Sequence, residues 1–334
     1  MMSLPIAVSM GDPAGIGLEI AAKAWAGGAQ PAFFVIGDAS AVARAGARAG
    51  IVAPVQAIAA PSEAEAAFSE ALPVLHRPLA REEIPARPDP ANAQSILDSI
   101  AEGVALCRAH AAAALVTLPI AKAPLYEAGF AHPGHTEFLG VLCADAGLPK
   151  AAPLMMLAVP GLRVALASVH IPLAAAAGAL TTAKLIDIAR LLDAALQSDF
   201  AIASPRIAVA GLNPHAGESG AIGREELEII APAVAALRAH GLNASGPAPA
   251  DTLFHPAARE RYDAVLCMYH DQGLIPLKML DFWGGVNITL GLPIVRTSPD
   301  HGVAYDIAGT GVARADSFLC ALRTAHSLAE QRRR

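Results

Sequence analysis

The sequence lacks close pairs of cysteines and basic clusters. Its 4 cysteines are widely spaced, so it carries no Cys-x-x-Cys motif, and we expect small buried thiols in a reducing cytoplasm. The net charge is −6. The only basic run is Arg332-Arg333-Arg334, which we expect to be solvated. Nucleic acid is therefore not expected as a partner.

The sequence also lacks a good membrane-spanning segment. The stretch from Val164 to Ala183 contains no Asp, Glu, Lys or Arg. It is rich in alanine, however, and includes His170 and Pro172, which favours a buried strand, a loop and a helix start over a membrane span. No basic region precedes the first apolar run, so we expect no signal peptide.

Hydrophobic residues are abundant: they make up 54% of the chain, against 16% charged residues. This composition excludes a disordered chain, and 334 residues suggest two lobes. Short apolar runs alternate with helical patterns, which indicates an α/β fold. The predicted strands span residues 6–10, 33–38, 72–75, 115–119, 154–159, 163–169, 206–211 and 264–268. The predicted helices span residues 19–26, 92–110, 138–146, 180–196 and 225–240.

The first strand leads into a glycine-rich turn that is not a dinucleotide loop. Its glycines stand at positions 11, 15 and 17, which does not match Gly-x-Gly-x-x-Gly. Asp12 and Glu19 either serve a site or cap and solvate the following helix, and we favour the second reading. Asp38, at the end of the second strand, either holds a ribose or is a turn residue.

Ionisable side chains gather among apolar residues near the C-terminal end of the sequence. His270 and Asp271 follow the predicted strand 264–268, where open α/β sheets bind ligands. Lys278, Asn287 and Arg296 follow among glycines and prolines, a setting typical of loops that approach an anionic substrate. We interpret this segment as the wall of an active site.

Three histidines, His170, His215 and His270, each follow an apolar strand. Successive strand ends of an α/β fold converge on one edge of the sheet, and three neutral imidazoles would leave coordination positions open on a catalytic metal. Their spacing leaves three separate structural histidines equally open. Asp251 and Asp271 are the candidate partners of these rings.

A second candidate region precedes the predicted helix 138–146. Thr136 is expected to be the N-cap of this helix, where free backbone N–H groups would favour an anion such as phosphate. A cap does not explain His135 beside it.

Several motifs together resemble the 4-hydroxythreonine-4-phosphate dehydrogenase family of pyridoxal phosphate biosynthesis over nearly the whole chain. The matching segments are residues 11–17 (GDPAGIG), 134–137 (GHTE), 211–218 (GLNPHAGE), 250–254 (ADTLF), 268–273 (MYHDQG) and 285–293.

The resemblance implies an α/β fold with two α/β/α lobes around a central cleft, similar to isocitrate and isopropylmalate dehydrogenases and without a Rossmann loop. Residues 1–130 with 286–334 would form the nucleotide-side lobe. Residues 131–285 would form the lobe that carries metal, substrate and dimer contacts.

The resemblance also implies ligands and site residues. A divalent cation (zinc, magnesium or cobalt) would be held by His170, His215 and His270, with ligands shared across a homodimer. The substrate contacts would be His135, Thr136, Lys278, Asn287 and Arg296. The segment His301 to Gly309 resembles the adenosine-binding loop of the decarboxylating dehydrogenases, in which Asp306 would accept the ribose hydroxyls and favour NAD over NADP.

We therefore expect NAD-dependent oxidation of 4-phosphohydroxy-L-threonine to 2-amino-3-oxo-4-phosphooxybutanoate, which decarboxylates to 3-amino-2-oxopropyl phosphate. Lys278, Asp251 and Asp271 are all candidates for the base. Leu18, Leu118 and Val303 depart from the family pattern beside the site. These departures leave open a sister dehydrogenase acting on D-threonate or D-erythronate 4-phosphate or on a dihydrodiol. A metal-dependent hydrolase is the alternative from another class.

Overall fold

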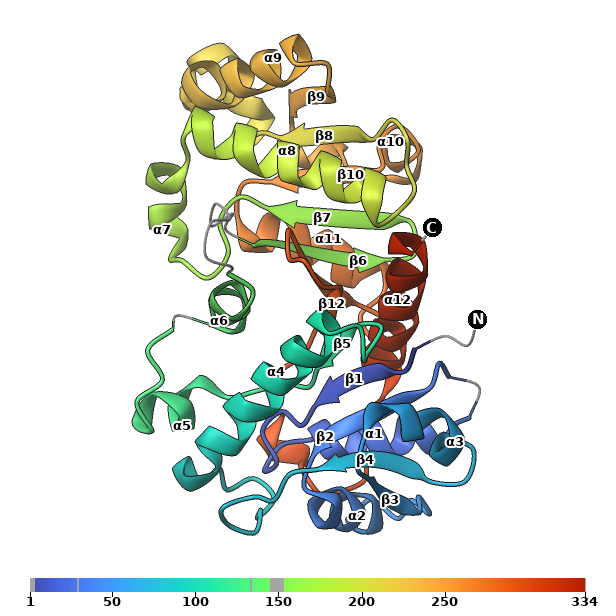
Figure 1. The fold of residues 1–334 in the computed structure, drawn as a ribbon. Helices are drawn as coiled ribbons and strands as arrows, with labels where there is room; N and C mark the ends of the chain where they lie inside the picture. Colours follow the sequence, from blue (N-terminus) through green and yellow to red (C-terminus); the bar gives the residue numbers. More distant parts are fainter. Residues whose placement is uncertain (1–3, 29, 133, 145–152, 334) are drawn as a thin grey trace. The chain divides into compact units, whose positions relative to one another are not determined.

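The computed structural model describes residues 4–28, 30–132, 134–144 and 153–333. Two compact units divide the chain (Figure 1): unit 1 comprises Met1–Pro153 with Leu292–Arg333, and unit 2 comprises Leu154–Gly291. The boundaries between the two lobes predicted from the sequence fall after residues 130 and 285, whereas the boundaries between the two units fall after residues 153 and 291. The nucleotide and substrate roles given to those lobes stay predictions.

Unit 1 contains a wholly parallel sheet in the order β3-β4-β2-β1-β5-β12. Its two central strands are buried along their whole length, because both faces of a parallel sheet are covered and its strands are apolar throughout. The strands are β1 (Ile6–Ser9), β2 (Phe33–Gly37), β3 (Val55–Ile58), β4 (Leu72–His76), β5 (Leu115–Thr117) and β12 (Arg296–Pro299).

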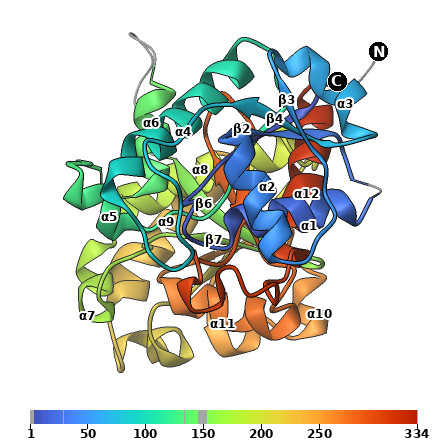
Figure 2. The same ribbon diagram turned by 90° about the horizontal axis from the view of Figure 1, so that it is seen from below.

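The helices of unit 1 pack on this sheet and on one another. Helix α1 packs against both α2 and α12 (Figure 2), and α4 packs against β1, β2 and β5. The helices are α1 (Gly17–Ala26), α2 (Ala39–Arg48), α3 (Ala64–Phe68), α4 (Ala93–Arg108), α5 (Lys122–Glu127), α6 (His135–Leu142) and α12 (Asp316–Arg332).

Unit 2 contains a mixed sheet in the order β11-β6-β7-β10-β8-β9. The predicted strands 154–159 and 163–169 form as β6 and β7, which pair as an antiparallel hairpin, and β7, β10, β8 and β9 run parallel to one another. The carboxyl ends of β7, β10 and β8 therefore lie at one edge of the sheet. The strands are β6 (Leu154–Val159), β7 (Leu162–Leu166), β8 (Arg206–Ala210), β9 (Asn243–Ala248), β10 (Ala264–Cys267) and β11 (Val286–Leu290).

The helices of unit 2 include one irregular element. A π-helical turn, Glu226–Ile230, runs directly into α9 (Ala231–Ala239), so the predicted helix 225–240 forms with a different first turn. The other helices are α7 (Leu173–Ala176), α8 (Thr182–Ser198), α10 (Pro256–Arg259) and α11 (His270–Leu280). Across the described ranges, no helix has both the length and the apolar character that crossing a bilayer requires.

The expectation of loops around Lys278, Asn287 and Arg296 is wrong. Lys278 lies in α11, Asn287 in β11, and Arg296 is the first residue of β12. Helix α11 forms because Leu274 and Leu277 are buried on one face, although the helix contains a glycine and a proline. Strand β9, which ends at Ala248, has no counterpart among the predicted strands.

Candidate functional site

The three histidines predicted to bind a metal all lie beyond the carboxyl ends of parallel strands in unit 2. His170 follows β7, His215 follows β8, and His270 is the first residue of α11 after β10. Because β7 and β10 are neighbours in the sheet, the ring centroids of His170 and His270 are 5.7 Å apart. The structure thus brings two of the three predicted ligands together.

His270 is oriented by its neighbour in α11. Its Nδ1 atom lies 2.7 Å from Oδ1 of Asp271, and in the tautomer that makes this hydrogen bond Nδ1–H donates. A carboxylate on one imidazole nitrogen commonly orients a histidine whose other nitrogen binds a metal. The hydrogen bond therefore agrees with the prediction that Asp271 is a partner of His270.

His215 opens a turn of unusual backbone conformation. The φ angles from His215 to Ser219 are all positive, between 44° and 76°. A run of left-handed residues is costly for L-amino acids and needs support from its surroundings. That support includes the buried carboxylate of Glu226. It accepts the Leu212 and Asn213 N–H groups, each at 2.7 Å, and the Asn213 side-chain amide at 2.9 Å.

The described residues of one chain do not assemble a complete metal-binding set. Over the described residues, no three His, Cys, Asp or Glu side chains gather closely enough to hold an ion. Asp251, predicted to support the histidines, is exposed in the short turn Ala250–Thr252 after β9. The assignment of His170, His215 and His270 as ligands stays a prediction.

Two candidate bases and one substrate contact lie on α11 and β11 of unit 2. Asp271 and Lys278 lie on the same helix, about 10 Å apart along its axis at 1.5 Å per residue. Nζ of Lys278 is 5.2 Å from the centroid of the Phe282 ring. Asn287 is partly buried in β11, and its Oδ1 atom has no hydrogen-bond partner among the described residues.

In unit 1, the buried Arg296 and the partly buried His135 interact electrostatically. Nη2 of Arg296 donates to Oγ1 of Thr117 at 2.5 Å, and burial lowers the pKa of the guanidinium to about 9. Burial, and then the Arg296 charge, hold the pKa of His135 well below its ordinary value, so its imidazole is neutral. Its buried Nε2 atom has no partner within the described part of the chain. An anion would complete this arrangement.

The prediction that Thr136 caps a helix is wrong. Helix α6 begins at His135, with Gly134 in the N-cap position and no side-chain cap. Thr136 therefore lies in the first turn, close to the backbone N–H groups that a helix start leaves without intrahelical partners. Residue 146, the predicted end of this helix, lies outside the described residues.

The interpretation of Asp12 as a helix cap is also wrong. Ile16 occupies the N-cap position of α1, and Asp12 is buried. Its carboxylate accepts the Tyr305 hydroxyl at 2.5 Å and the Ala14 N–H at 2.9 Å. Burial raises the pKa of Asp12 more than these two hydrogen bonds lower it. No sequence pattern predicts this contact, because it joins positions far apart in the chain.

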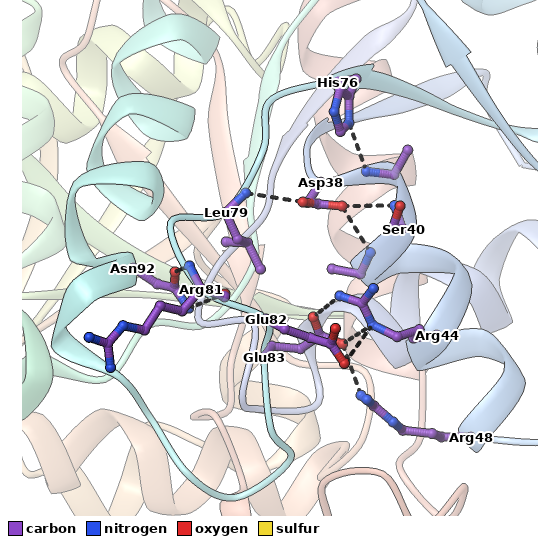
Figure 3. Close-up of polar contacts among 12 residues, drawn as sticks. Asp38, Ser40, Arg44, Arg48, His76, Leu79, Arg81, Glu82, Glu83 and Asn92 are labelled. Carbon is purple, nitrogen blue, oxygen red and sulfur yellow. Dashed lines mark hydrogen bonds and ion pairs between the residues drawn. The ribbon is translucent and has the colours of Figure 1, made fainter.

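Glu19 and Asp38 have structural contacts in unit 1. Glu19 is buried in α1 and does not solvate it; its Oε1 atom accepts Lys23 Nζ at 2.8 Å. Asp38, predicted to hold a ribose or to be a turn residue, is the N-cap of α2, and it also accepts the Leu79 N–H at 3.0 Å (Figure 3).

The predicted nucleotide-binding residues lie in the segment before α12. Asp306 is exposed in the short turn Tyr305–Ile307, and Nδ1 of His301 lies 3.0 Å from the Gly302 carbonyl oxygen. The segment is held to the glycine-rich turn after β1, because the Ile16 N–H donates to the Val303 carbonyl at 3.0 Å.

Comparison with known proteins agrees with the resemblance seen in the sequence. The family model described as "Pyridoxal phosphate biosynthetic protein PdxA" matches residues 29–325. The chain is 58% identical to the 4-hydroxythreonine-4-phosphate dehydrogenase of Caulobacter vibrioides over 99% of each chain. The crystal structure of the Klebsiella pneumoniae enzyme of that name superposes with a TM-score of 0.86 at 40% identity, covering 98% of this chain and 100% of the other.

A further solved structure of a different dehydrogenase is also similar. The terephthalate 1,2-cis-dihydrodiol dehydrogenase of Burkholderia xenovorans has a TM-score of 0.63 at 29% identity, covering 98% of both chains. The fold and these matches thus define an α/β oxidoreductase. The chain belongs to the 4-hydroxythreonine-4-phosphate dehydrogenase family of pyridoxal phosphate biosynthesis. The predicted family and α/β fold class are confirmed.

Proposed function

We propose that this chain oxidises 4-phosphohydroxy-L-threonine with NAD and a divalent cation, which is zinc, magnesium or cobalt. The product, 2-amino-3-oxo-4-phosphooxybutanoate, then loses carbon dioxide to give 3-amino-2-oxopropyl phosphate. The observation that carries this proposal is the 58% identity to the Caulobacter vibrioides enzyme over 99% of both chains.

The histidines after the unit 2 strands suit a divalent cation. The 5.7 Å between the His170 and His270 rings allows both to reach one ion, and Asp271 leaves the second nitrogen of His270 available. The described residues of one chain hold no set of three ligands. In the proposal two subunits share each site, as the family resemblance implies, and His215 is the third ligand. The cation, when bound, acts as a Lewis acid that lowers the pKa of the substrate alcohol.

The anionic groups of the substrate have candidate partners in both units. Arg296, with a pKa of about 9, is cationic at neutral pH, and the neutral His135 beside it offers an unoccupied Nε2 atom. These residues would bind and orient one charged end, together with Thr136. Lys278 and Asn287 are the proposed contacts from unit 2.

The remaining roles concern the cofactor and the base. The Asp306 carboxylate would accept the ribose hydroxyls and repel a 2′-phosphate, which favours NAD, and His301 lies at the start of the same segment. NAD supplies the hydride acceptor. Lys278, Asp251 and Asp271 remain the candidates for the group that removes the alcohol proton.

A cytoplasmic homodimer is part of the proposal. Helix α11 and the residues after it expose several large apolar side chains, a pattern that favours a protein interface over bare solvent contact. These side chains are Ile275, Met279, Phe282 and Trp283. Because α11 begins at His270, a subunit contact there would bring the partner close to a proposed ligand.

The activity is tested with purified protein, NAD and a divalent cation. Rapid appearance of reduced-nicotinamide absorbance with 4-phosphohydroxy-L-threonine, and much slower turnover of D-threonate and D-erythronate 4-phosphates, is the expected result. Preference for either acid, or for a cis-dihydrodiol, would assign the chain to a sister activity, as the match to the dihydrodiol dehydrogenase allows. Phosphate release without any absorbance change would indicate the hydrolase alternative.

The ligand set is tested with His215→Ala. We expect this variant to lose metal-dependent turnover, with Thr182→Val in α8 as a control that keeps it. Full metal-dependent turnover by His215→Ala would remove His215 from the proposed set.

A further inference from the structure

The three strand exits that carry the histidines are joined by buried side-chain hydrogen bonds. Oγ of Ser168 donates to the Met268 carbonyl at 2.7 Å, which links the exits of β7 and β10. The Gln272 side chain accepts the Met268 N–H at 2.7 Å and donates to the Gly211 carbonyl at 2.7 Å, which links the exits of β10 and β8.

Gln272 is placed to affect two of the proposed ligands at once. It lies in the first turn of α11, two positions after His270, and its carbonyl reaches back to the N–H of Met268, two positions before His270. Its amide nitrogen holds Gly211, the residue at which the chain leaves β8 toward His215. The side chain is 8% exposed, so water does not readily replace these bonds.

We propose that Gln272 is a positioning residue that fixes the backbone beside His270 and the backbone that leads to His215. The inference rests on the proposed function, because it assumes that these histidines bind the cation. Gln272 itself contacts no reacting atom; it acts on the backbone on either side of His270 and ahead of His215.

An amide is the side-chain group that fits both partners. The Met268 N–H requires an acceptor and the Gly211 carbonyl requires a donor, and an amide offers one of each. Gln272→Met keeps the length and volume of the side chain but removes both groups. Gln272→Asn keeps the amide but is one methylene shorter, so it reaches only one of the two backbone partners.

The matched control is Thr182→Val. Thr182 also bonds a backbone carbonyl within unit 2, since its Oγ1 atom donates to Ile229 at 3.1 Å. This bond joins α8 to the π-helical turn and touches none of the three strand exits. The substitution therefore removes one side-chain bond to a backbone carbonyl and leaves the hydrogen bonds of Gln272 and Glu226 in place.

The experiment uses the full-length protein freed of metal with a chelator and titrated with Co²⁺ alone. Binding is followed by the visible absorption of the Co²⁺ complex and by competition with a chelator, and urea unfolding of the metal-free protein measures stability. We expect Gln272→Met to weaken Co²⁺ binding by about 10–100-fold, as is usual for groups that orient metal ligands, and to change the absorption band. Gln272→Asn should fall between this variant and the wild type, and Thr182→Val should bind Co²⁺ as the wild type does.

The outcomes separate this inference from the proposed function. If Gln272→Met and Gln272→Asn unfold more easily but bind Co²⁺ within about twofold of the wild type, which is negligible on the scale of that loss, Gln272 is structural only. The positioning role is then overturned while the proposed function stands. If Co²⁺ affinity falls as expected but the wild type oxidises none of the phosphorylated acids, the inference holds and the proposed substrate is wrong. Wild-type protein that binds no Co²⁺ would overturn both the metal site and the inference.

Discussion

Gly217 lies in the left-handed turn after β8, and its replacement by alanine tests how that turn is held. The residue has a φ of +76°, and a Cβ atom built on it would lie 2.5 Å from Oε2 of Glu226 and 2.9 Å from the Gly223 carbonyl oxygen. Alanine at position 217 would therefore have an unfavourable backbone conformation, and its Cβ atom would clash with Glu226 and Gly223. Gly241 has a φ of +86° with no atom within 4 Å of its Cβ position, so alanine there meets the backbone strain alone.

The contacts of Glu226 determine how much more unfolding free energy Gly217→Ala loses than Gly241→Ala. Backbone strain costs each variant about 1–2 kcal/mol. At Gly217 the Glu226 carboxylate must also move, and hydrogen bonds to a charged group contribute about 1.5–3 kcal/mol. We therefore expect Gly217→Ala to lose about 2.5–5 kcal/mol of unfolding free energy and Gly241→Ala about 1–2 kcal/mol.

Urea unfolding measures this difference, and both glycines lie in unit 2, so one transition reports on both. Gly217→Ala should also lower turnover, because the same turn carries His215, whereas Gly241→Ala should not. Equal losses of stability in the two variants would show that Glu226 does not fill the space beside Gly217 in solution, and would refute the reasoning.

Three further predictions concern unit 1. Thr117→Val removes a hydroxyl that accepts from the buried Arg296, so it should cost about 1.5–3 kcal/mol in urea unfolding and raise the KM for the phosphorylated substrate. Burial raises the pKa of Glu83, but the hydrogen bonds from Arg44 and Arg48 lower it by more (Figure 3). The pKa of this carboxyl group therefore lies below its ordinary value. Its stabilisation is therefore complete above the ordinary pKa of 4.5 and is lost as the pH falls through the lowered value, so Glu83→Gln and wild-type melting temperatures should converge in acid. Tyr305→Phe removes the hydrogen bond to Asp12 and should raise the KM for NAD by about 3–10-fold at unchanged kcat, which corresponds to one hydrogen bond.

Each of these predictions has a contradicting result. An unchanged KM for Thr117→Val would mean that the hydroxyl does not help to place Arg296. A melting-temperature difference for Glu83→Gln that is constant with pH would show that ionisation of this carboxylate adds nothing. A fall in kcat without a rise in KM for Tyr305→Phe would indicate that the hydroxyl acts in catalysis and does not hold the nucleotide segment.

The parts of the fold that the sequence predicted well are those determined by local hydrophobic pattern. The strands β1, β2, β5, β8 and β10 are predominantly apolar, and each agrees with a predicted strand. Strand β9 was missed because it is at the edge of its sheet and contains Gly246 and Pro247, residues typical of loops. Helix α11 was missed for a similar reason. Its Gly273 is required by tertiary packing, since a Cβ there would lie 2.2 Å from Val164 Cγ1 of β7.

The candidate site was predictable only where strand order brings residues together. His170 and His270 each follow an apolar strand, and the two strands are parallel neighbours, so their rings meet. The conformation of the turn at His215 depends on Glu226 and on glycines that allow close packing, which no local pattern reveals. The contact of Asp12 with Tyr305 joins the two ends of the sequence, so only tertiary structure could show it.

The direction of the pKa shift separates two kinds of buried charge in unit 1. Glu83 has a lowered pKa because Arg44 and Arg48 more than offset its desolvation, as expected of a structural ion pair. Asp12 and Arg296 shift the opposite way, toward their neutral forms, because burial outweighs their contacts. Charged groups kept in such surroundings oppose folding, and groups of this kind concentrate at functional sites. Asp12 thereby joins Arg296 as a candidate site residue, although the sequence had favoured a helix cap.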